Sequence, residues 1–93
     1  MNPGMMKKLQ KMQRDMVSAQ QELEASTFYG SAGGGVVKVE MLGSKKMKNI
    51  EIDPSVIDDK DDIEMMQDLI IVAINDCMRK IDDETQSVMS QFT

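Results

Sequence analysis

A run of glycines is the first place in the sequence where residue types and spacing could bind a ligand. Gly30 and Gly35 are separated by four residues, as the glycines of a phosphate-binding P-loop are. A P-loop continues with Lys and then Ser or Thr, but Val36 and Val37 occupy those positions here. The phosphate-binding amides of such loops also belong to a helix N-terminus, whereas this run leads into an alternating strand pattern. The glycines therefore predict a hinge between structural elements and no nucleotide site.

Acidic residues gather in the segment DDKDDIE at residues 58–64, and oxygen atoms are the ligands that calcium prefers. The segment lacks the glycine that an EF-hand loop requires for its sharp turn. Carboxylates at the start of a helix also accept hydrogen bonds from free N–H groups and oppose the helix dipole, which explains most of this cluster. The prediction is a helix start without a metal site.

The chain offers few groups for catalysis. It contains no His and one cysteine, Cys77, which falls on the apolar stripe of a helical pattern, where a buried thiol is expected. Asp82 and Asp83 are adjacent and so point in different directions on a helix. We therefore expect no enzymatic activity, no cofactor and no small-molecule substrate.

Charge is distributed unevenly along the 93 residues, whose net charge is -5. Eight basic and four acidic residues lie up to Lys48, whereas three basic and twelve acidic residues follow from Asn49 onward. Such asymmetry indicates either a charged partner surface or two halves of the chain that attract each other. The sequence leaves both explanations open.

The N-terminal segment carries a narrow apolar seam. After a helix-breaking lead-in at residues 2–4, apolar residues recur with spacings of four and three, as in a coiled coil. The seam consists of Met5, Leu9, Met12, Met16, Ala19 and Leu23. It predicts a helix of about 20 residues, or roughly 30 Å, that pairs with another helix. In so short a chain the symmetry mate is one candidate for that helix.

The opposite face of this helix is basic. Lys7, Lys11 and Arg14 stand at i, i+4 and i+7, Lys8 lies on the flank, and no acidic residue occurs before Asp15. The outer face of a coiled-coil helix usually mixes both signs of charge. The pattern indicates either a solvated basic face or a surface for an anionic partner.

Three strand signals occupy the middle of the chain. Phe28 and Tyr29 begin a short strand, and residues 36–42 alternate apolar and polar side chains. Residues 47–53 repeat the pattern until Pro54 ends it, because proline cannot donate to a strand ladder. Tight connections, including a hairpin turn at residues 43–45, predict an antiparallel sheet.

A second helical pattern begins in the acidic segment. Its apolar stripe consists of Ile63, Met66, Ile70, Ala73, Ile74, Cys77 and Ile81. The run LIIVAI at residues 69–74 is apolar nearly all round, which predicts burial by the sheet on one side and by a second subunit on another. Toward residues 88–92 the pattern weakens, and we expect the helix to fray there unless a partner holds it.

The apolar run LIIVAI at residues 69–74 also bears on the location of the protein in the cell. Six apolar residues are too few to span a membrane. The N-terminus also lacks the apolar core of a signal peptide. We therefore expect a cytoplasmic protein without a membrane partner.

In their order along the chain, these segments closely resemble the YbaB/EbfC family of bacterial nucleoid-associated proteins. The resemblance is carried by MMKKLQKMQ at 5–13, GSAGGGVVKV at 30–39, IEIDPSVI at 50–57 and EMMQDLIIVAINDCMRKI at 64–81. It implies one domain over residues 1–93 with an α+β fold, in which a helix, a three-stranded antiparallel sheet and a helix (α-β-β-β-α) form an intertwined homodimer with projecting helices. It also implies DNA binding in the nucleoid without known enzymatic activity.

Charge and resemblance together predict a homodimer that binds double-stranded DNA, mainly through phosphates and with weak sequence selectivity. The expected DNA-binding residues are Lys7, Lys8, Lys11 and Arg14 on the first helix and Lys45, Lys46 and Lys48 at the hairpin, with Arg79 and Lys80 as a third place. The expected dimer interface consists of Met5, Leu9, Met12, Met16, Leu23, Ile70 and Ile74. The alternative is a dimeric protein-interaction module that serves recombination or replication factors without binding DNA itself.

Overall fold

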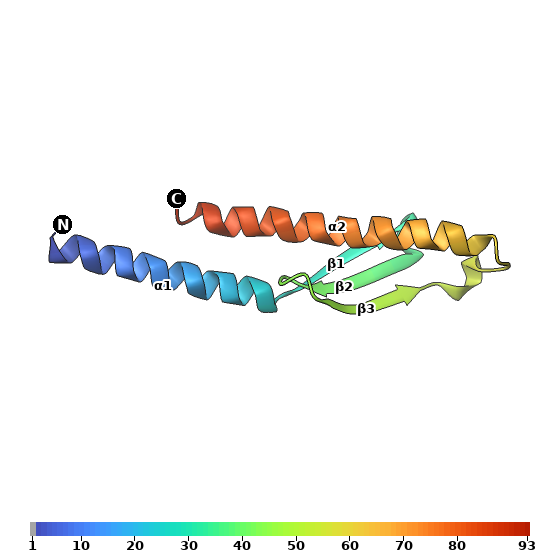
Figure 1. Ribbon diagram of the computed structural model, residues 1–93, viewed down its shortest axis with the longest axis horizontal. Coiled ribbons are helices and arrows are strands. Elements are labelled where there is room, and N and C mark those ends of the chain that lie inside the picture. The colour runs from blue at the N-terminus through green and yellow to red at the C-terminus, as the bar shows by residue number, and fades with distance from the viewer. Residues whose placement is uncertain (1) are drawn as a thin grey trace.

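The structure, a computed structural model, describes residues 2–93 of the chain. Its elements are helix α1 (Pro3–Ala25), strands β1 (Thr27–Ala32), β2 (Val37–Leu42) and β3 (Met47–Ile52), and helix α2 (Asp62–Ser90). This α-β-β-β-α order confirms the predicted fold class. The molecule is elongated, with extents of 70 × 18 × 16 Å, because α1 runs outward from the sheet instead of folding back over it (Figure 1).

Helix α1 begins earlier than the sequence indicated. Residues 2–4 were expected to break the helix, but Pro3 and Gly4 lie in its first turn and the expectation was wrong. Proline is tolerated there because the first turn has no intrahelical partner for its missing N–H. The Asn2 side chain caps the helix by accepting a hydrogen bond from the Met5 amide at 2.7 Å.

The three strands form one antiparallel sheet in the order β1-β2-β3. Gly30 stands opposite Val39, and Val39 stands opposite Ile50, so these positions share one face of the sheet. Strand β1 extends to Ala32, beyond the short strand expected around Phe28 and Tyr29. The alternation predicted for β2 is confirmed, because Val37, Val39 and Met41 are buried.

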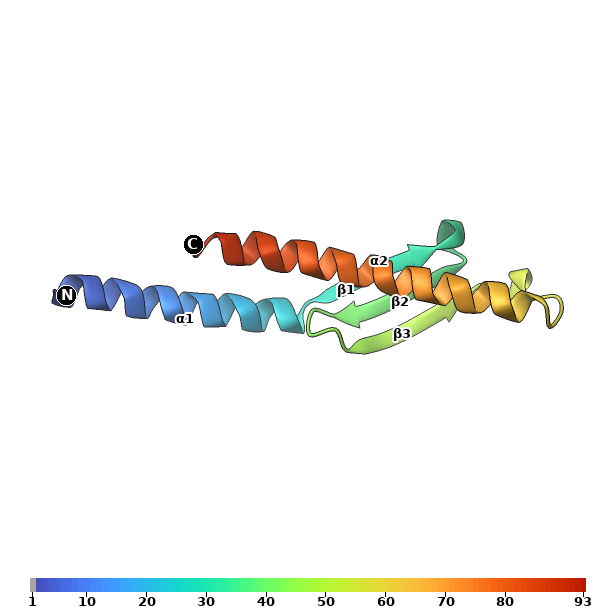
Figure 2. The same ribbon diagram turned by 45° about the horizontal axis from the view of Figure 1, so that its top comes forward.

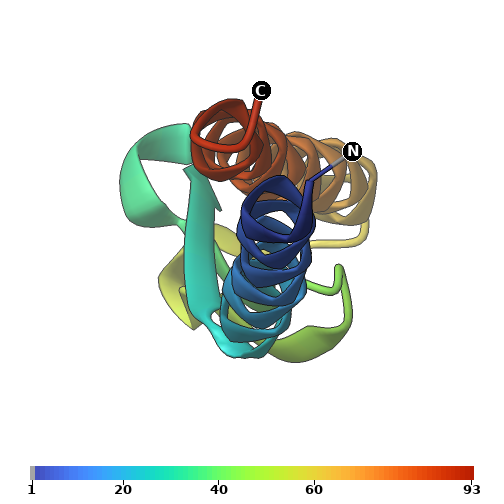
Figure 3. The same ribbon diagram turned by 90° about the vertical axis from the view of Figure 1, so that its left-hand side faces the viewer.

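Helix α2 covers this inner face, packing on β1 and β2 (Figure 3). The aliphatic core lies between the helix and the two strands. Its buried members are Ala32, Val37, Val39, Met41, Met66, Ala73, Cys77 and Ile81. The helix continues to Ser90, into the region of residues 88–92 where fraying was expected. Within residues 2–93, no helix has the length and apolarity that crossing a membrane requires.

The glycine run connects β1 to β2. Gly33, Gly34 and Gly35 have φ angles of 64°, 68° and 95°, a region that other L-residues rarely adopt. Gly30, the other glycine with P-loop spacing, is a β1 residue packed beneath Ala73 and Cys77 of α2. The run therefore serves as the predicted hinge, although it lies at the end of the sheet that is remote from α1 (Figure 2).

A different glycine fixes the direction of α1. The Gly43 amide donates to the Ser26 carbonyl at 2.8 Å, and the Ser44 amide donates to the Glu24 carbonyl at 3.2 Å. Gly43 lies so close to the Leu23 carbonyl oxygen that a Cβ there would overlap it. The β2–β3 hairpin is thus fastened to the C-terminal end of α1, and this junction sets where the helix projects.

Gly43→Ala is expected to weaken this junction. The added methyl group meets backbone atoms of Leu23, which cannot move aside as a flexible side chain would. We expect the free energy of unfolding to fall by at least about 1–3 kcal/mol, the usual cost of overpacking. Gly4→Ala is the control, because its Cβ would be in ordinary contact with Asn2. Urea denaturation measures both, and equal stability of the two variants would contradict the close junction.

Candidate nucleic-acid interface

The predicted basic face lies on the part of α1 that extends beyond the end of α2 (Figure 1). The side chains of Lys7, Lys8, Lys11 and Arg14 are exposed, and we call these four residues the basic tip. The Lys11 ammonium pairs with the Asp15 carboxylate at 2.7 Å. Among the described residues, the other three cations form no ion pair. The tip therefore presents an unbalanced positive surface.

The apolar seam on the other side of α1 is covered only at one end. Exposure falls steadily along it, from 52% at Met5 through 48%, 45% and 36% at Leu9, Met12 and Met16 to 7% at Leu23. Leu23 and Ala19 lie beside Glu84 and Val88 of α2, which ends soon afterwards. The four N-terminal members of the seam, Met5, Leu9, Met12 and Met16, remain exposed.

A second uncovered apolar surface lies beside α2. Ile71, Ile74 and Met78 share one flank of the helix, since they stand at i, i+3 and i+7. Asp82 on the same flank pairs with Lys45 of the hairpin at 2.8 Å, which places the flank on the β3 side of the helix. Ile50 of β3 and Ile71 are exposed. We call Ile50, Ile71, Ile74 and Met78 the apolar flank.

The lysines of the hairpin are largely compensated by nearby carboxylates. Besides the Lys45–Asp82 pair, the Lys48 ammonium lies 3.6 Å from Glu40 and donates to the Thr27 hydroxyl at 3.3 Å. Lys46 forms no ion pair within residues 2–93. The second predicted patch therefore has a smaller excess of positive charge than the basic tip.

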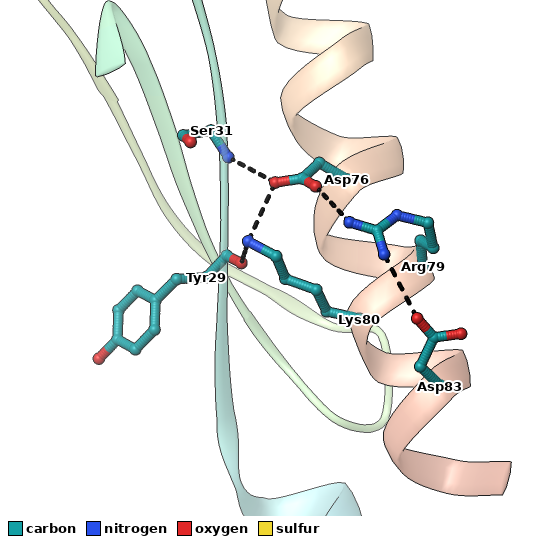
Figure 4. A network of polar contacts seen from close by, with 6 residues as sticks. All are labelled: Tyr29, Ser31, Asp76, Arg79, Lys80 and Asp83. Carbon is teal, nitrogen blue, oxygen red and sulfur yellow. Dashed lines mark hydrogen bonds and ion pairs between the residues drawn. The ribbon is translucent and has the colours of Figure 1, made fainter. Parts of the chain in front are cut away.

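The third predicted place, at Arg79 and Lys80, is part of a polar clasp between α2 and β1 (Figure 4). The Asp76 carboxylate accepts the Ser31 amide at 3.1 Å and contacts Lys80 at 3.1 Å and Arg79 at 3.0 Å. Lys80 also donates to the Tyr29 carbonyl at 3.2 Å. Since Ser31 and Tyr29 belong to an edge strand, the clasp satisfies backbone groups that would otherwise be unpaired. Both cations therefore have structural contacts that a DNA site would have to break.

Protonation states follow from these contacts. The hydrogen bond from the Ser31 amide, with those from Lys80 and Arg79, lowers the pKa of Asp76 below its ordinary value. The carboxylate is therefore charged at neutral pH and the clasp is closed. Burial raises the pKa of the Cys77 thiol, which accordingly lacks the thiolate character of a nucleophile.

The acidic segment before α2 holds its own backbone. The Asp62 carboxylate accepts the amides of Asp58 and Asp59 at 2.8 and 3.2 Å, and these bonds lower its pKa. Asp61, at the N-cap, makes no side-chain cap bond. The carboxylates therefore stabilise the loop before α2 more than the first turn of the helix. Within residues 2–93, no three His, Cys, Asp or Glu side chains are grouped to hold a metal ion.

The basic tip and the acidic segment lie at opposite ends of the molecule (Figure 1). The long axis measures 70 Å, whereas the Debye length at 0.1 M salt is about 10 Å. Attraction between the tip and the acidic segment of the same chain is therefore screened.

The fold and this surface define an elongated α+β protein in which one long helix covers a face of an antiparallel sheet and the other extends from the end of the sheet as a cationic arm. A sequence model described as the YbaB/EbfC DNA-binding family matches residues 1–93. The chain belongs to this family, which confirms the resemblance found in the sequence.

Relatives with curated names match almost the whole chain. The nucleoid-associated protein of Ruminiclostridium cellulolyticum is 48% identical over 90 residues, which cover 97% of this chain and 77% of that protein. Nucleoid-associated protein OB0030 of Oceanobacillus iheyensis is 49% identical, with coverage of 97% and 86%. The crystal structure of the uncharacterized protein HP0035 from Helicobacter pylori has a TM-score of 0.77 at 21% identity, covering 98% and 96% of the two chains. This last likeness concerns the fold alone.

Proposed function

We propose that this protein is a nucleoid-associated DNA-binding protein that acts as a homodimer and grips duplex DNA mainly through its phosphates. The observation that carries the proposal is the basic tip, four exposed cations on a projecting helix with no carboxylate before Asp15. The name of the family and the names of the relatives agree with this ligand. We place the protein in the cytoplasm on the nucleoid, with an architectural or regulatory role and no catalytic one.

Weak sequence selectivity is part of the proposal. Bidentate recognition of guanine is chiefly the work of arginine, and the chain has two, Arg14 and Arg79. Arg79 is engaged by Asp76 and Asp83 at 3.0 and 3.3 Å. The remaining cations of the tip are lysines, which act as point charges toward phosphate. Contacts of this kind position the protein on DNA without reading the sequence.

A second copy of the chain is the proposed cover for both uncovered apolar surfaces. The seam from Met5 to Met16 has the spacing of a helix-pairing surface, and the apolar flank borders the core beside an open strand edge. A single chain of 93 residues buries only about 60–65% of its unfolded surface, so further burial adds stability. The resulting dimer would present two basic tips.

Duplex binding is expected to depend steeply on salt. With six to eight phosphate contacts per dimer, affinity should fall by about three to four decades between 50 and 200 mM salt. A titration of labelled duplex at the two concentrations measures this drop. A duplex affinity that does not change with salt would contradict binding through phosphates. No shift at low salt, together with a pull-down of protein that survives nuclease treatment, would favour the alternative of a protein-interaction module built on the exposed methionines of the seam.

A further inference from the structure

The face of the sheet opposite α2 carries an aromatic side chain that the core does not use. Tyr29 is 62% exposed, and it is the one tyrosine of a chain that has no tryptophan. Its neighbours Phe28 and Gly30 point to the inner face, because successive side chains alternate along a strand. The Tyr29 ring points away from α2 (Figure 4). Folding therefore leaves this ring available to a ligand.

A cation and a shallow hollow accompany the ring. Residues of β1, β2, α2 and the glycine run line a hollow of about 410 Å3, and among them are Tyr29, Ser31, Gly34, Lys38 and Lys80. Lys38 is exposed and, within the described residues, forms no ion pair. Its Cε lies beside the loop, 3.4 Å from the position that a Cβ on Gly35 would take.

Most of the carboxylates around the hollow are already compensated. Glu40 pairs with Lys48 at 3.6 Å, and Asp76 is held by Arg79, Lys80 and the Ser31 amide. Glu51, which stands opposite Lys38 in the strand register, forms no ion pair in the described part of the chain and reduces the local potential. A ligand here would be held by the ring as well as by charge, and more weakly than at the basic tip.

We propose that this surface is a second nucleic-acid site, at which Tyr29 stacks on an unpaired base and Lys38 contacts an adjacent phosphate. Aromatic rings beside cations are the means by which proteins bind single strands, and the stacking tolerates any base. Bases within a duplex are stacked on each other, so the ligand of this site is single-stranded nucleic acid. The clasp on the Tyr29 carbonyl and the Ser31 amide holds the strand beneath the ring in place.

The single tyrosine makes the site directly observable. Emission from this chain comes from Tyr29, and stacking of a base should quench it. We expect saturable quenching by a single-stranded oligonucleotide, and none by an abasic strand of equal length, which offers the same phosphates without bases. Free tyrosinamide corrects for absorption by the oligonucleotide. Equal quenching by the oligonucleotide and the abasic strand, or no quenching by either, would overturn the proposal.

Variants separate this site from the basic tip. In a chain with a neutralised tip, Tyr29→Ala should weaken single-strand binding about 5- to 150-fold, the range expected for loss of one stacked base, whereas Tyr29→Phe should retain it. Lys38→Gln should lower the salt slope by about 0.7 for each site. The Tyr29 variants should leave duplex affinity unchanged, and a chain with a neutralised tip should still be quenched. Single-strand affinity unchanged by Tyr29→Ala in the chain with a neutralised tip, or quenching lost when the tip is neutralised, would refute a separate site.

Discussion

Replacement of Lys7, Lys11 and Arg14 by glutamine is expected to lower the affinity for duplex DNA by at least about a hundredfold at 50 mM salt. Each phosphate contact contributes about 0.9 to the slope of log affinity against log salt, so the loss of six contacts from a dimer lowers the slope by about 5. Glutamine has nearly the helix propensity of lysine and arginine, and α1 should persist. Duplex titrations at several salt concentrations measure both quantities.

A control variant has the same net charge as the glutamine variant but keeps the basic tip. Ser55→Asp, Lys60→Gln and Met65→Glu lower the net charge by three at exposed positions near the start of α2, at the end of the molecule remote from the tip. Screening over the length of the molecule should leave its duplex affinity within a few fold of the original, since the Debye length is about 10 Å at 0.1 M salt. Equal losses in the two triple variants would show that total charge, and not the tip, governs binding. An unaltered salt slope in the tip variant would remove α1 from the site.

Ile71→Asp is expected to dissociate the proposed dimer. Burial of a fully exposed isoleucine is worth about 1.5–3 kcal/mol, and Ile71 is 56% exposed, so its two copies in a two-fold interface contribute about 1.7–3.4 kcal/mol before the cost of burying the new charge. The dissociation constant should therefore rise by at least about one to two decades. Ile71 is exposed in the single chain, so its replacement should leave the fold of each protomer intact.

The neighbouring residue supplies a matched control. Val72 is 54% exposed against 56% for Ile71, but it points to another side of α2, toward the charged positions Asp68 and Asp76. Val72→Asp should leave the association state unchanged. Sedimentation of the two variants over a range of concentrations, with circular dichroism to verify folding, measures the difference. A dimer of normal affinity in Ile71→Asp would exclude the apolar flank from the interface.

Much of the fold could be predicted from local patterns. The spacing of apolar residues identified both helices and the alternating strands, because burial on one face imposes periods of 3.6 and 2 residues. The boundaries were less accurate. Pro3 was interpreted as a helix breaker, although Asn2 caps a helix that begins at Pro3, and β1 extends to Ala32 because it pairs along the whole of β2.

The candidate site was only partly visible in the sequence. The basic tip could be found because a helix places Lys7, Lys11 and Arg14 on one face whatever the rest of the chain does. The compensation of Lys45 by Asp82 joins segments distant in sequence. Arg79 and Lys80 pair with Asp76 within one helix, but the Ser31 amide and the Tyr29 carbonyl that complete the clasp come from a distant strand. Ile50 and Ile71 were absent from the expected interface for the same reason, since their exposure depends on how α2 lies across the sheet.

The sequence by itself determined the order of the elements, the amphipathic faces of α1 and the lack of a P-loop, because each depends on residues close together along the chain. The tertiary structure decided which charges remain unpaired and where α1 projects. Gly43 illustrates the difference. As a hairpin glycine it was unremarkable, yet its contact with the Leu23 carbonyl directs the basic tip outward, at the opposite end of a 70 Å molecule from the acidic segment. Screening depends on distance in space, and only the folded chain defines that distance.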